Sequence, residues 1–461
     1  MNTKSSNLLS NVENTKQNLE SKTINVCVVG IGRIGLPTAL SFANCDLETI
    51  GVDVNEKLIE MVNTGIYPLK DEPGFDKIFD SVIKNKKLKA IKDIQAALSK
   101  SELVILSLPT PMDSDNVPDY SALRSVAKSL NDFMKSGTII VVESTVEPGF
   151  IENKLIPIIE GDGSRIKCGK DFSIAACPEA ANPGEILNDF TKLPRVIGGI
   201  DETTTEIVSE IYKHIFNVEI IKMSNCKTAN AVKLTTNVFR DVNIAFVNEL
   251  ALLFEKLGID IFTVLDAAKR KYNFQVHYPG SGVGGPCLPV NSYQLLNTSK
   301  TIGNNLLKIV KAGREVNENM PAHVVRLLCD CFEQLNEKIE KRTILVLGIT
   351  YKPDVKDVQL SPAESIINNL TKLGCTVKIY DPYYKNQKIF GIDTEADLIK
   401  ILPKTDAIII NTAHKEFCNI DPILLSSKMK KPIVVDARGV IDIHAAKKAG
   451  LLFRGLGRGT S

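Results

Sequence analysis

The segment that decides the fold is Ile24-Asn25-Val26-Cys27-Val28-Val29-Gly30-Ile31-Gly32-Arg33-Ile34-Gly35. An apolar run typical of a buried strand leads into the pattern G-x-G-x-x-G, and a helical stretch follows from Leu36 to Cys45. In such a unit the first glycine permits a tight turn, the second lets the backbone approach a pyrophosphate, and the third allows close helix–strand packing. The segment therefore predicts the dinucleotide-binding unit of an α/β domain.

The cofactor preference is indicated by Asp53, which ends the next apolar run, Thr49-Ile50-Gly51-Val52. An acid at this distance binds the ribose 2′-hydroxyl, and its charge repels a 2′-phosphate, so the pattern favours NAD over NADP. The helix N-terminus after the glycines offers amide donors to the phosphates. The residues expected to bind NAD are Gly30, Ile31, Gly32, Arg33, Ile34, Gly35, Asp53, Thr110 and Thr145.

The chain has 461 residues, which suits two or three domains. Further strand-like runs at 103–108, 138–142, 173–176 and 196–197 alternate with helical patterns, which predicts a parallel sheet. Strands are not expected between about 205 and 335, where residues 227–257 contain neither Pro nor Gly and predict a long helix. Alternation resumes with strands at 343–347, 376–380, 407–411 and 432–436.

We therefore predict an α/β protein with two Rossmann-like, doubly wound parallel-sheet domains, joined by a central helical domain with a long spine helix. The spine is also the expected surface of a homodimer. The expected divisions are a disordered tail (1–22), an NAD-binding Rossmann domain (23–207), a central helical and dimerisation domain (208–335) and a C-terminal Rossmann-like domain (336–461).

The composition excludes several classes of protein. The formal net charge is +2, from 56 basic and 54 acidic residues, which gives no electrostatic case for binding nucleic acid or an anionic membrane. No apolar run approaches the roughly 20 residues of a membrane helix, and the polar N-terminus lacks a signal peptide's apolar stretch. The ten cysteines form no C-x-x-C pair, so neither a metal site nor a disulfide framework is expected. These features favour a cytoplasmic protein.

The segment richest in chemistry is Pro279-Gly280-Ser281-Gly282-Val283-Gly284-Gly285-Pro286-Cys287-Leu288-Pro289. Its four glycines and three prolines exclude a helix interior or a central strand. Such a loop brings the backbone close to a ligand and presents the Cys287 thiol at the point of closest approach. The alternative is an inert cysteine beside a tight turn.

Three other positions are candidates for catalysis. Lys233 and Asn237 are four residues apart on one face of the long helix, where an ammonium and an amide can stabilise an oxyanion; the alternative is a solvated surface lysine. Thr145 follows a strand and can orient a water or a ligand. Glu179 also follows a strand and can serve as a base, although by itself it is more typical of an exposed turn.

Taken together and in this order, these motifs resemble the UDP-glucose/GDP-mannose dehydrogenase family over residues 24–445. The resemblance implies oxidation of a UDP-sugar C6 alcohol to a carboxylate in two steps, each reducing one NAD. It implies that Cys287 captures the aldehyde as a thiohemiacetal that becomes a thioester. Lys233 would favour the thiolate and, with Asn237, stabilise the oxyanions. Glu179 would activate the hydrolytic water that Thr145 positions.

Within the family, residues 237–245 and His277 resemble the branch that acts on UDP-N-acetyl-D-mannosamine, which serves polysaccharide biosynthesis. The resemblance also implies that the C-terminal domain binds UDP. The substrate-binding residues it implies are Glu179, Lys233, Asn237, Arg240, His277, Gly282, Gly285, Asn291, Lys352 and Arg438.

The chain departs from the family pattern mainly at sugar- and phosphate-facing positions. Asn291 stands where an Asp is usual and Arg33 where an aromatic is common, and arginines are replaced by Ala180, Asn273 and Gln359. The substrate therefore stays open between UDP-N-acetylmannosamine, UDP-N-acetylglucosamine and UDP-glucose. Two other classes also remain: a simple β-hydroxyacid dehydrogenase, which needs neither the cysteine loop nor a third domain, and a relative that binds nucleotide sugar without turnover.

Overall fold

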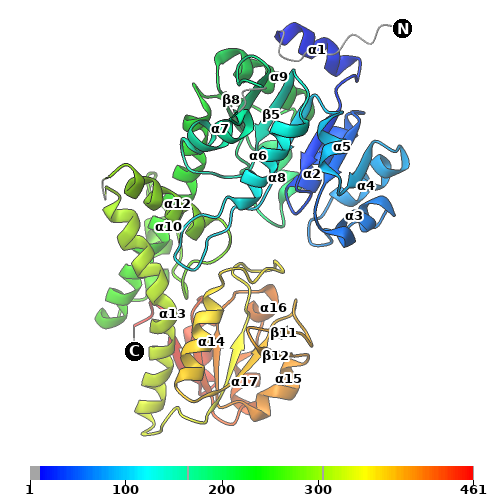
Figure 1. Ribbon diagram of the computed structural model, residues 1–461. Coiled ribbons are helices and arrows are strands. Elements are labelled where there is room, and N and C mark those ends of the chain that lie inside the picture. The colour runs from blue at the N-terminus through cyan, green and yellow to red at the C-terminus, as the bar shows by residue number, and fades with distance from the viewer. Residues whose placement is uncertain (1–10, 163–165, 304–305, 460–461) are drawn as a thin grey trace. The chain divides into compact units, whose positions relative to one another are not determined.

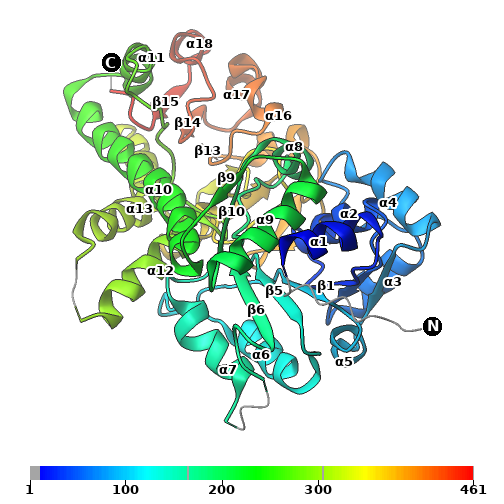
Figure 2. The same ribbon diagram turned by 90° about the horizontal axis from the view of Figure 1, so that it is seen from above.

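The computed structural model describes residues 11–162, 166–303 and 306–459. The chain divides into two compact units, Met1–Thr236 with Tyr293–Ile302, and Asn237–Ser292 with Gly303–Ser461. Each unit contains one largely parallel sheet flanked by helices (Figures 1 and 2), which confirms the predicted α/β, Rossmann-like fold class. Among the described residues, no helix is long and apolar enough to cross a membrane.

The first unit is built on an eight-stranded sheet with the order β3-β2-β1-β4-β5-β6-β7-β8. All neighbouring strands are parallel except the β6–β7 pair. The strands are β1 (Val26–Val29), β2 (Thr49–Val52), β3 (Leu88–Ile91), β4 (Leu103–Leu106), β5 (Thr138–Val142), β6 (Phe172–Ala176), β7 (Arg195–Gly199) and β8 (Ile220–Lys222). The order reverses between β1 and β4, and ligands bind beyond the carboxyl ends of strands at such a switch point.

The apolar run that precedes the glycines is β1, at the centre of this sheet. All four of its residues are buried: Val26 and Val28 pack into one apolar layer, Cys27 and Val29 into the other. A strand covered on both faces requires a continuous apolar run. The helices of this unit are α1 (Val12–Glu20), α2 (Gly35–Asn44), α3 (Glu56–Asn63), α4 (Phe75–Lys84), α5 (Ile94–Leu98), α6 (Ser121–Phe133), a π-helical turn (Ile151–Leu155), α7 (Ile156–Glu160), α8 (Ile186–Lys192) and α9 (Glu202–Phe216).

The second unit is built on a seven-stranded sheet with the order β11-β12-β10-β9-β13-β14-β15, in which only the β11–β12 pair is antiparallel. The strands are β9 (Thr343–Leu347), β10 (Thr376–Tyr380), β11 (Lys388–Ile389), β12 (Ile392–Glu395), β13 (Ala407–Ile410), β14 (Ile433–Asp436) and β15 (Leu452–Gly455). The helices over this sheet are α14 (Pro362–Lys372), α15 (Leu398–Ile401), a 3-10 turn (Leu402–Lys404), α16 (Lys415–Cys418), α17 (Pro422–Lys428) and α18 (Ile443–Lys448).

The predicted spine helix is confirmed as α10 (Cys226–Leu257), which runs from the first unit into the second. It is followed by α11 (Ile261–Ala268), α12 (Leu288–Thr301) and α13 (Lys308–Gln334). Strand β8 lies inside the segment that the sequence predicts to be free of strands, so that expectation is wrong there. β8 is three residues long, which is too short for a period-two pattern to be visible, and in the described part of the chain it pairs only with β7.

The expectation of a disordered tail over residues 1–22 is wrong for its second half, while residues 1–10 lie outside the described part. Residues 12–20 form α1, whose first turn is capped by the Asn11 side chain accepting from the Asn14 backbone N–H. α1 packs beside α9 (Figure 2), where it buries Thr15 and Leu19. A polar segment of this kind is ordered by tertiary contact, which its composition does not reveal.

Candidate functional site

The glycine loop after β1 has the geometry that its sequence predicts. Gly30 has φ +85°, and a Cβ there would lie 2.5 Å from the Ser107 carbonyl oxygen, so only glycine fits. A Cβ on Gly35 would overlap the Gly30 carbonyl, because α2 begins directly against the loop. Gly32 is exposed, with no atom within 4 Å of its Cβ position. The open position of Gly32 fits the close approach of a pyrophosphate.

Asp53 follows β2 beside this loop. Its Oδ2 accepts the Ile31 backbone N–H at 3.0 Å, and its Oδ1 accepts the Asn55 N–H at 2.9 Å. The carboxylate is thereby fixed at the edge of the loop, where an acid recognises the adenosine ribose.

The side chain of Arg33 is engaged within the protein. Its guanidinium forms ion pairs of 2.7 Å with Asp71 and with the buried Glu72. Glu72 in turn accepts the Gly184 backbone N–H at 2.7 Å, in the loop that begins at Glu179. Through Glu72, Arg33 therefore ties the glycine loop to the segment that contains Glu179 and Gly184.

Thr110 and Thr145 meet beyond the carboxyl ends of β4 and β5. The Thr110 hydroxyl donates to the Thr145 carbonyl at 3.0 Å, and the amide of Gln294 donates to the same oxygen at 3.1 Å. Ser144 holds the β4 loop by accepting the Leu108 N–H at 2.8 Å. The structure thus brings both predicted threonines to one place, at the sheet edge where the cofactor is expected.

Glu179 is held in an ion pair with the buried Arg195, and its Oε1 also accepts the backbone N–H groups of Ala180 and Ala181. Arg195 lies against the rings of Phe190 and Phe216, with its guanidinium carbon 4.4 Å and 4.3 Å from their centroids. Arg195 and the two backbone N–H groups therefore fix the position of the Glu179 carboxyl group.

Beside this pair lies Glu143, a fully buried carboxyl group at the end of β5. Its Oε1 accepts the Tyr212 hydroxyl at 2.8 Å, and its Oε2 accepts the Thr38 hydroxyl at 3.0 Å. Burial, and then the charge of Glu179, raise the pKa of Glu143 to about 7, against the lowering effect of Arg195. Arg195 thus pairs directly with Glu179 and acts on Glu143 only through its charge.

In the second unit, Cys287 is exposed at the start of α12, whose first turn is marked by the Asn291 N–H donating to the Cys287 carbonyl at 2.9 Å. The dipole of α12 favours negative charge at this end. Lys233 is half-buried on α10 in the first unit, whereas Asn237, one turn later, belongs to the second.

Neighbouring atoms leave no room for a side chain at the glycines before Cys287. Gly285 has φ +86°, and its Cβ would lie 2.6 Å from the Tyr351 ring. Gly282 has φ +130°, and its Cβ would lie 2.9 Å from the Asn317 carbonyl oxygen. A Cβ on Gly284 would overlap the Leu360 carbonyl oxygen. The cysteine loop therefore packs directly against the segment that follows β9.

Asn237 donates its side-chain amide to the Asn291 side-chain oxygen at 2.5 Å. One turn further along α10, Asp241 accepts the Ser292 hydroxyl at 2.7 Å and forms a buried 2.9 Å ion pair with Arg314 of α13. These contacts fix the first turn of α12, and with it Cys287, against α10.

The predicted UDP-binding residues lie at the carboxyl end of the second sheet. Lys352 is half-buried in the loop after β9. Arg438 follows β14, and its backbone N–H donates to Asp436 at 2.9 Å. The Arg438 guanidinium occupies the space that a side chain at Gly280 would need, and burial lowers its pKa.

Two further predicted substrate residues, His277 and Arg240, belong to this unit. His277 is half-buried, with Nδ1 3.1 Å from the Gln275 carbonyl and its ring 6.1 Å from that of Phe239. Arg240, the next residue on α10, is exposed.

Several residues of the site were missed by sequence reasoning. Asp241 is four residues after Asn237, and this helical spacing alone would have indicated it. Asn411 follows β13 as Asp53 follows β2; its side-chain oxygen accepts the Ser281 hydroxyl at 2.7 Å. Arg195 gives no sequence signal, because it is a strand residue paired over a long loop. Thr145, Glu179 and Lys233 lie in the first unit and Cys287 in the second, so their proximity stays a prediction.

Comparison with known proteins supports this picture over most of the chain. Three models of the UDP-glucose/GDP-mannose dehydrogenase family match: the NAD binding domain over residues 24–216, the central domain over 227–319 and the UDP binding domain over 345–443. A curated relative, the UDP-N-acetyl-D-mannosamine dehydrogenase of Pyrococcus horikoshii, is 33% identical over 434 residues, covering 94% of this chain and 99% of the relative.

Solved structures also match this chain over most of its length. The P. horikoshii UDP-D-ManNAc dehydrogenase structure has a TM-score of 0.87 at 32% identity, covering 94% of this chain and 99% of that one. The structure of an NDP-N-acetyl-D-galactosaminuronic acid dehydrogenase from Methanosarcina mazei has a TM-score of 0.84 at 30% identity, and the match covers 96% of this chain and 98% of that one. The structure of a UDP-glucose dehydrogenase from Pyrobaculum islandicum has a TM-score of 0.82 at 27% identity, and the match covers 94% of this chain and 98% of that one. The sugar differs among these names, so the fold alone does not select it.

Proposed function

Because the chain belongs to the UDP-glucose/GDP-mannose dehydrogenase family, and its cofactor is NAD, we propose that it oxidises the C6 alcohol of UDP-N-acetyl-D-mannosamine to the carboxylate. The observation that carries the proposal is the exposed Cys287 at the end of a loop whose glycines are fixed by their neighbours. A thiol presented in this way suits capture of an aldehyde.

NAD, when bound, accepts the hydride lost from C6 in each oxidation. The Cys287 thiolate adds to the C6 aldehyde, and the resulting alkoxide takes up a proton to give a thiohemiacetal. The remaining C6 hydrogen is then lost as hydride and the hydroxyl proton is released to water, which leaves a thioester. Water then adds to the thioester carbon, the C–S bond breaks, and the acid and the free thiol are released.

The other residues have roles that fit their surroundings. Lys233 and Asn237 stabilise the oxyanions that form at C6, since an ammonium and an amide donor both favour negative charge. Glu179, held in place by Arg195, takes the proton of the attacking water, which Thr145 positions. Lys352 and Arg438 bind the diphosphate of the UDP-sugar.

We further propose that the enzyme is a homodimer in the cytoplasm. On α10, Phe239, Phe246 and Leu253 recur every seven residues and are 47%, 50% and 51% exposed. Residues with this spacing share one helix face, and a second copy of the chain would cover it. All ten cysteines are free thiols, which supports a reducing compartment.

The test follows NADH at its absorbance maximum with UDP-N-acetylmannosamine, UDP-N-acetylglucosamine and UDP-glucose in turn. We expect two NADH for each UDP-N-acetylmannosamine consumed, and far lower kcat/KM for the other sugars. Cys287→Ser should stop before the acid forms, whereas Cys418→Ser, at an exposed cysteine away from the loop, should behave as the unaltered enzyme.

The outcomes separate the alternatives. Preference for another of the three sugars would reassign the substrate and retain the reaction. Binding of UDP-sugar without NADH formation would indicate a relative that binds nucleotide sugar without turnover. Unimpaired acid formation by Cys287→Ser would contradict the thioester route.

A further inference from the structure

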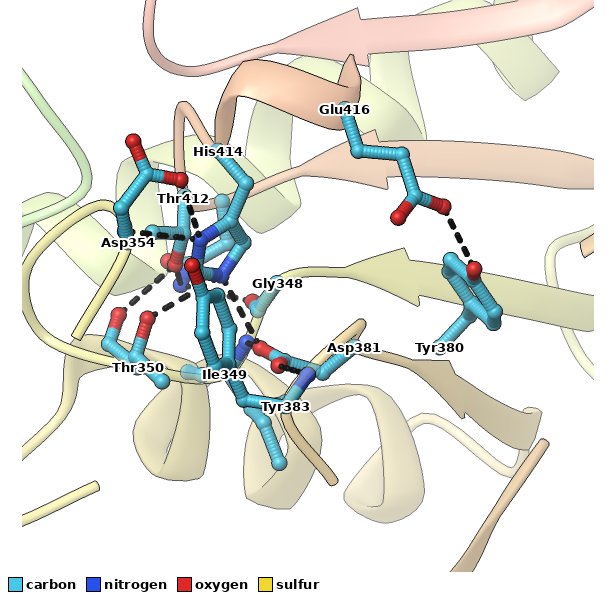
Figure 3. Close-up of polar contacts among 12 residues, drawn as sticks. Gly348, Ile349, Thr350, Asp354, Tyr380, Asp381, Tyr383, Thr412, His414 and Glu416 are labelled. Atoms are coloured by element: carbon cyan, nitrogen blue, oxygen red, sulfur yellow. Dashed lines mark hydrogen bonds and ion pairs between the residues drawn. The ribbon is translucent and has the colours of Figure 1, made fainter. Parts of the chain in front are cut away.

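A buried histidine lies beneath the loop that carries Lys352, and the mechanism above does not use it. His414 precedes α16 and is completely buried, as is Asp381, which follows β10. The Nε2 of His414 lies 3.1 Å from Oδ2 of Asp381, and its Nδ1 lies 3.0 Å from the backbone nitrogen of Asp354 (Figure 3). Because the ring is closed off from solvent, it cannot touch the substrate.

The hydrogen bonds define the protonation of the ring. A backbone N–H can only donate, so Nδ1 of His414 is the acceptor for Asp354 and carries no proton. The proton is therefore on Nε2, which faces Asp381 and lies 3.2 Å from the Thr350 hydroxyl oxygen. The neutral Nε2–H form links the end of β10 to the loop after β9.

The same group of residues fixes the rest of that loop. Asp381 Oδ2 also accepts the Ile349 N–H at 2.8 Å, and the Thr350 hydroxyl donates to the Lys352 carbonyl at 2.9 Å. Asp354 has φ +59°, a left-handed conformation that glycine adopts freely and that Asp adopts where local contacts support it. The contact with His414 holds Asp354 in this conformation, and Lys352 lies between these two anchored points.

The loop that carries Lys352 also packs against the cysteine loop. Tyr351 packs against Gly285, and the Asn411 side chain joins Ser281 to the Gly348 carbonyl, at 2.7 Å and 3.0 Å. A shift of residues 349–354 would therefore displace the backbone beside Lys352 and disturb the packing of the loop that ends at Cys287.

We propose that His414 is a positioning residue: together with Asp381 it holds residues 349–354 in the conformation that presents Lys352 to the diphosphate of the nucleotide sugar. The inference rests on the proposed function, since it deepens the role given there to Lys352. It assigns His414 no contact with substrate and no proton transfer.

The two ring nitrogens can be tested separately. In His414→Asn, the side-chain oxygen falls near the position of Nδ1 and keeps an acceptor for the Asp354 N–H. In His414→Gln, the amide falls near the position of Nε2 and keeps the link to Asp381, but the acceptor for Asp354 is lost. Thr350→Val removes the hydroxyl that donates to Lys352 and keeps the shape of the side chain. His444→Gln, at an exposed histidine of α18, is the matched control.

Binding of UDP and of NAD is measured by calorimetry in the full-length protein, with KM and kcat for the UDP-sugar alongside. We expect His414→Gln and Thr350→Val to raise the Kd for UDP and the KM for the sugar about tenfold, the loss of roughly one hydrogen bond. NAD affinity should stay unchanged. His414→Asn should remain within about threefold of the unaltered protein, as should His444→Gln.

Wild-type UDP affinity in both His414→Gln and Thr350→Val would overturn the inference and leave the proposed function intact. A parallel fall in NAD affinity would overturn it too, because the histidine would then only stabilise the fold. An equal loss of UDP affinity in His414→Asn and His414→Gln would show that the contact between His414 and Asp354 does not hold the loop, and would overturn that part of the inference. Absence of UDP binding in the unaltered protein would overturn the inference together with the proposed substrate class.

Discussion

The side-chain amide of Asn237 donates to the side-chain oxygen of Asn291 over 2.5 Å, which ties the spine helix to the first turn of the helix that follows Cys287. Both side chains are buried. The family resemblance leads one to expect an Asp at position 291, and the structure shows that Asn supplies the same acceptor without the charge. The contact orients Asn237, which the proposed mechanism uses as an oxyanion donor.

Asn291→Ala should therefore lower kcat at least tenfold and destabilise the fold by about 1–3 kcal/mol, because the buried amide of Asn237 loses its acceptor. Asn291→Asp keeps an acceptor and should retain activity within about threefold. Steady-state NADH assays and thermal unfolding measure both effects. Equal activities for Asn291→Ala and the unaltered protein would contradict this role of the contact.

Gly285 and Gly391 offer a matched pair for testing the cysteine loop. Both have positive φ, +86° and +79°, but a Cβ at Gly285 would lie 2.6 Å from the Tyr351 ring, while no atom lies within 4 Å at Gly391. Each Gly→Ala change carries about 1 kcal/mol of backbone strain. We expect Gly285→Ala to lower the free energy of unfolding by about 1–3 kcal/mol more than Gly391→Ala does, and to abolish most of the activity. Denaturant unfolding and kcat of the two variants should diverge accordingly; similar values would show that the loop tolerates displacement.

Glu143 should make stability depend on pH. Burial raises its pKa in the folded chain from 4.5 to about 7, so the fold favours the protonated carboxyl. The contribution of Glu143 to the free energy of unfolding is fully present below pH 4.5 and is lost as the pH rises through about 7. Relative to Glu143→Gln, which cannot ionise, the unaltered protein should lose up to roughly 3 kcal/mol across this range. Urea unfolding at several pH values measures the difference between the two proteins.

The groups that face Glu143 also bear on this result. Glu179 repels its charge and Arg195 attracts it, while Tyr212 and Thr38 donate to it. Because these groups are common to both proteins, their own titration largely cancels in the difference. A difference in stability that does not change between pH 4.5 and 8 would show that Glu143 stays ionised in the fold.

The sequence predicts those parts of the site that depend on local backbone geometry. The glycine loop, Asp53 at a strand end and the long helix α10 all follow from spacing and periodicity over short stretches. Contacts between distant segments are beyond such reasoning: Ser281 with Asn411 and the Nδ1 of His414 with Asp354 depend on how the second sheet folds. The donors and acceptors there are ordinary loop residues, and only the packed structure pairs them.

The exposed apolar face of α10 leads to the last prediction. Phe239, Phe246 and Leu253 share one helix face and are about half exposed, so water contacts a stripe that a second copy can cover. Phe246→Asp places a charge at the centre of this stripe and should convert the proposed dimer into monomers, as measured by light scattering after size exclusion. Ile423→Asp, at an apolar residue of α17 that is 60% exposed, should leave the mass unchanged. A monomeric unaltered protein, or a dimer that survives Phe246→Asp, would show that this face of α10 is not the subunit interface.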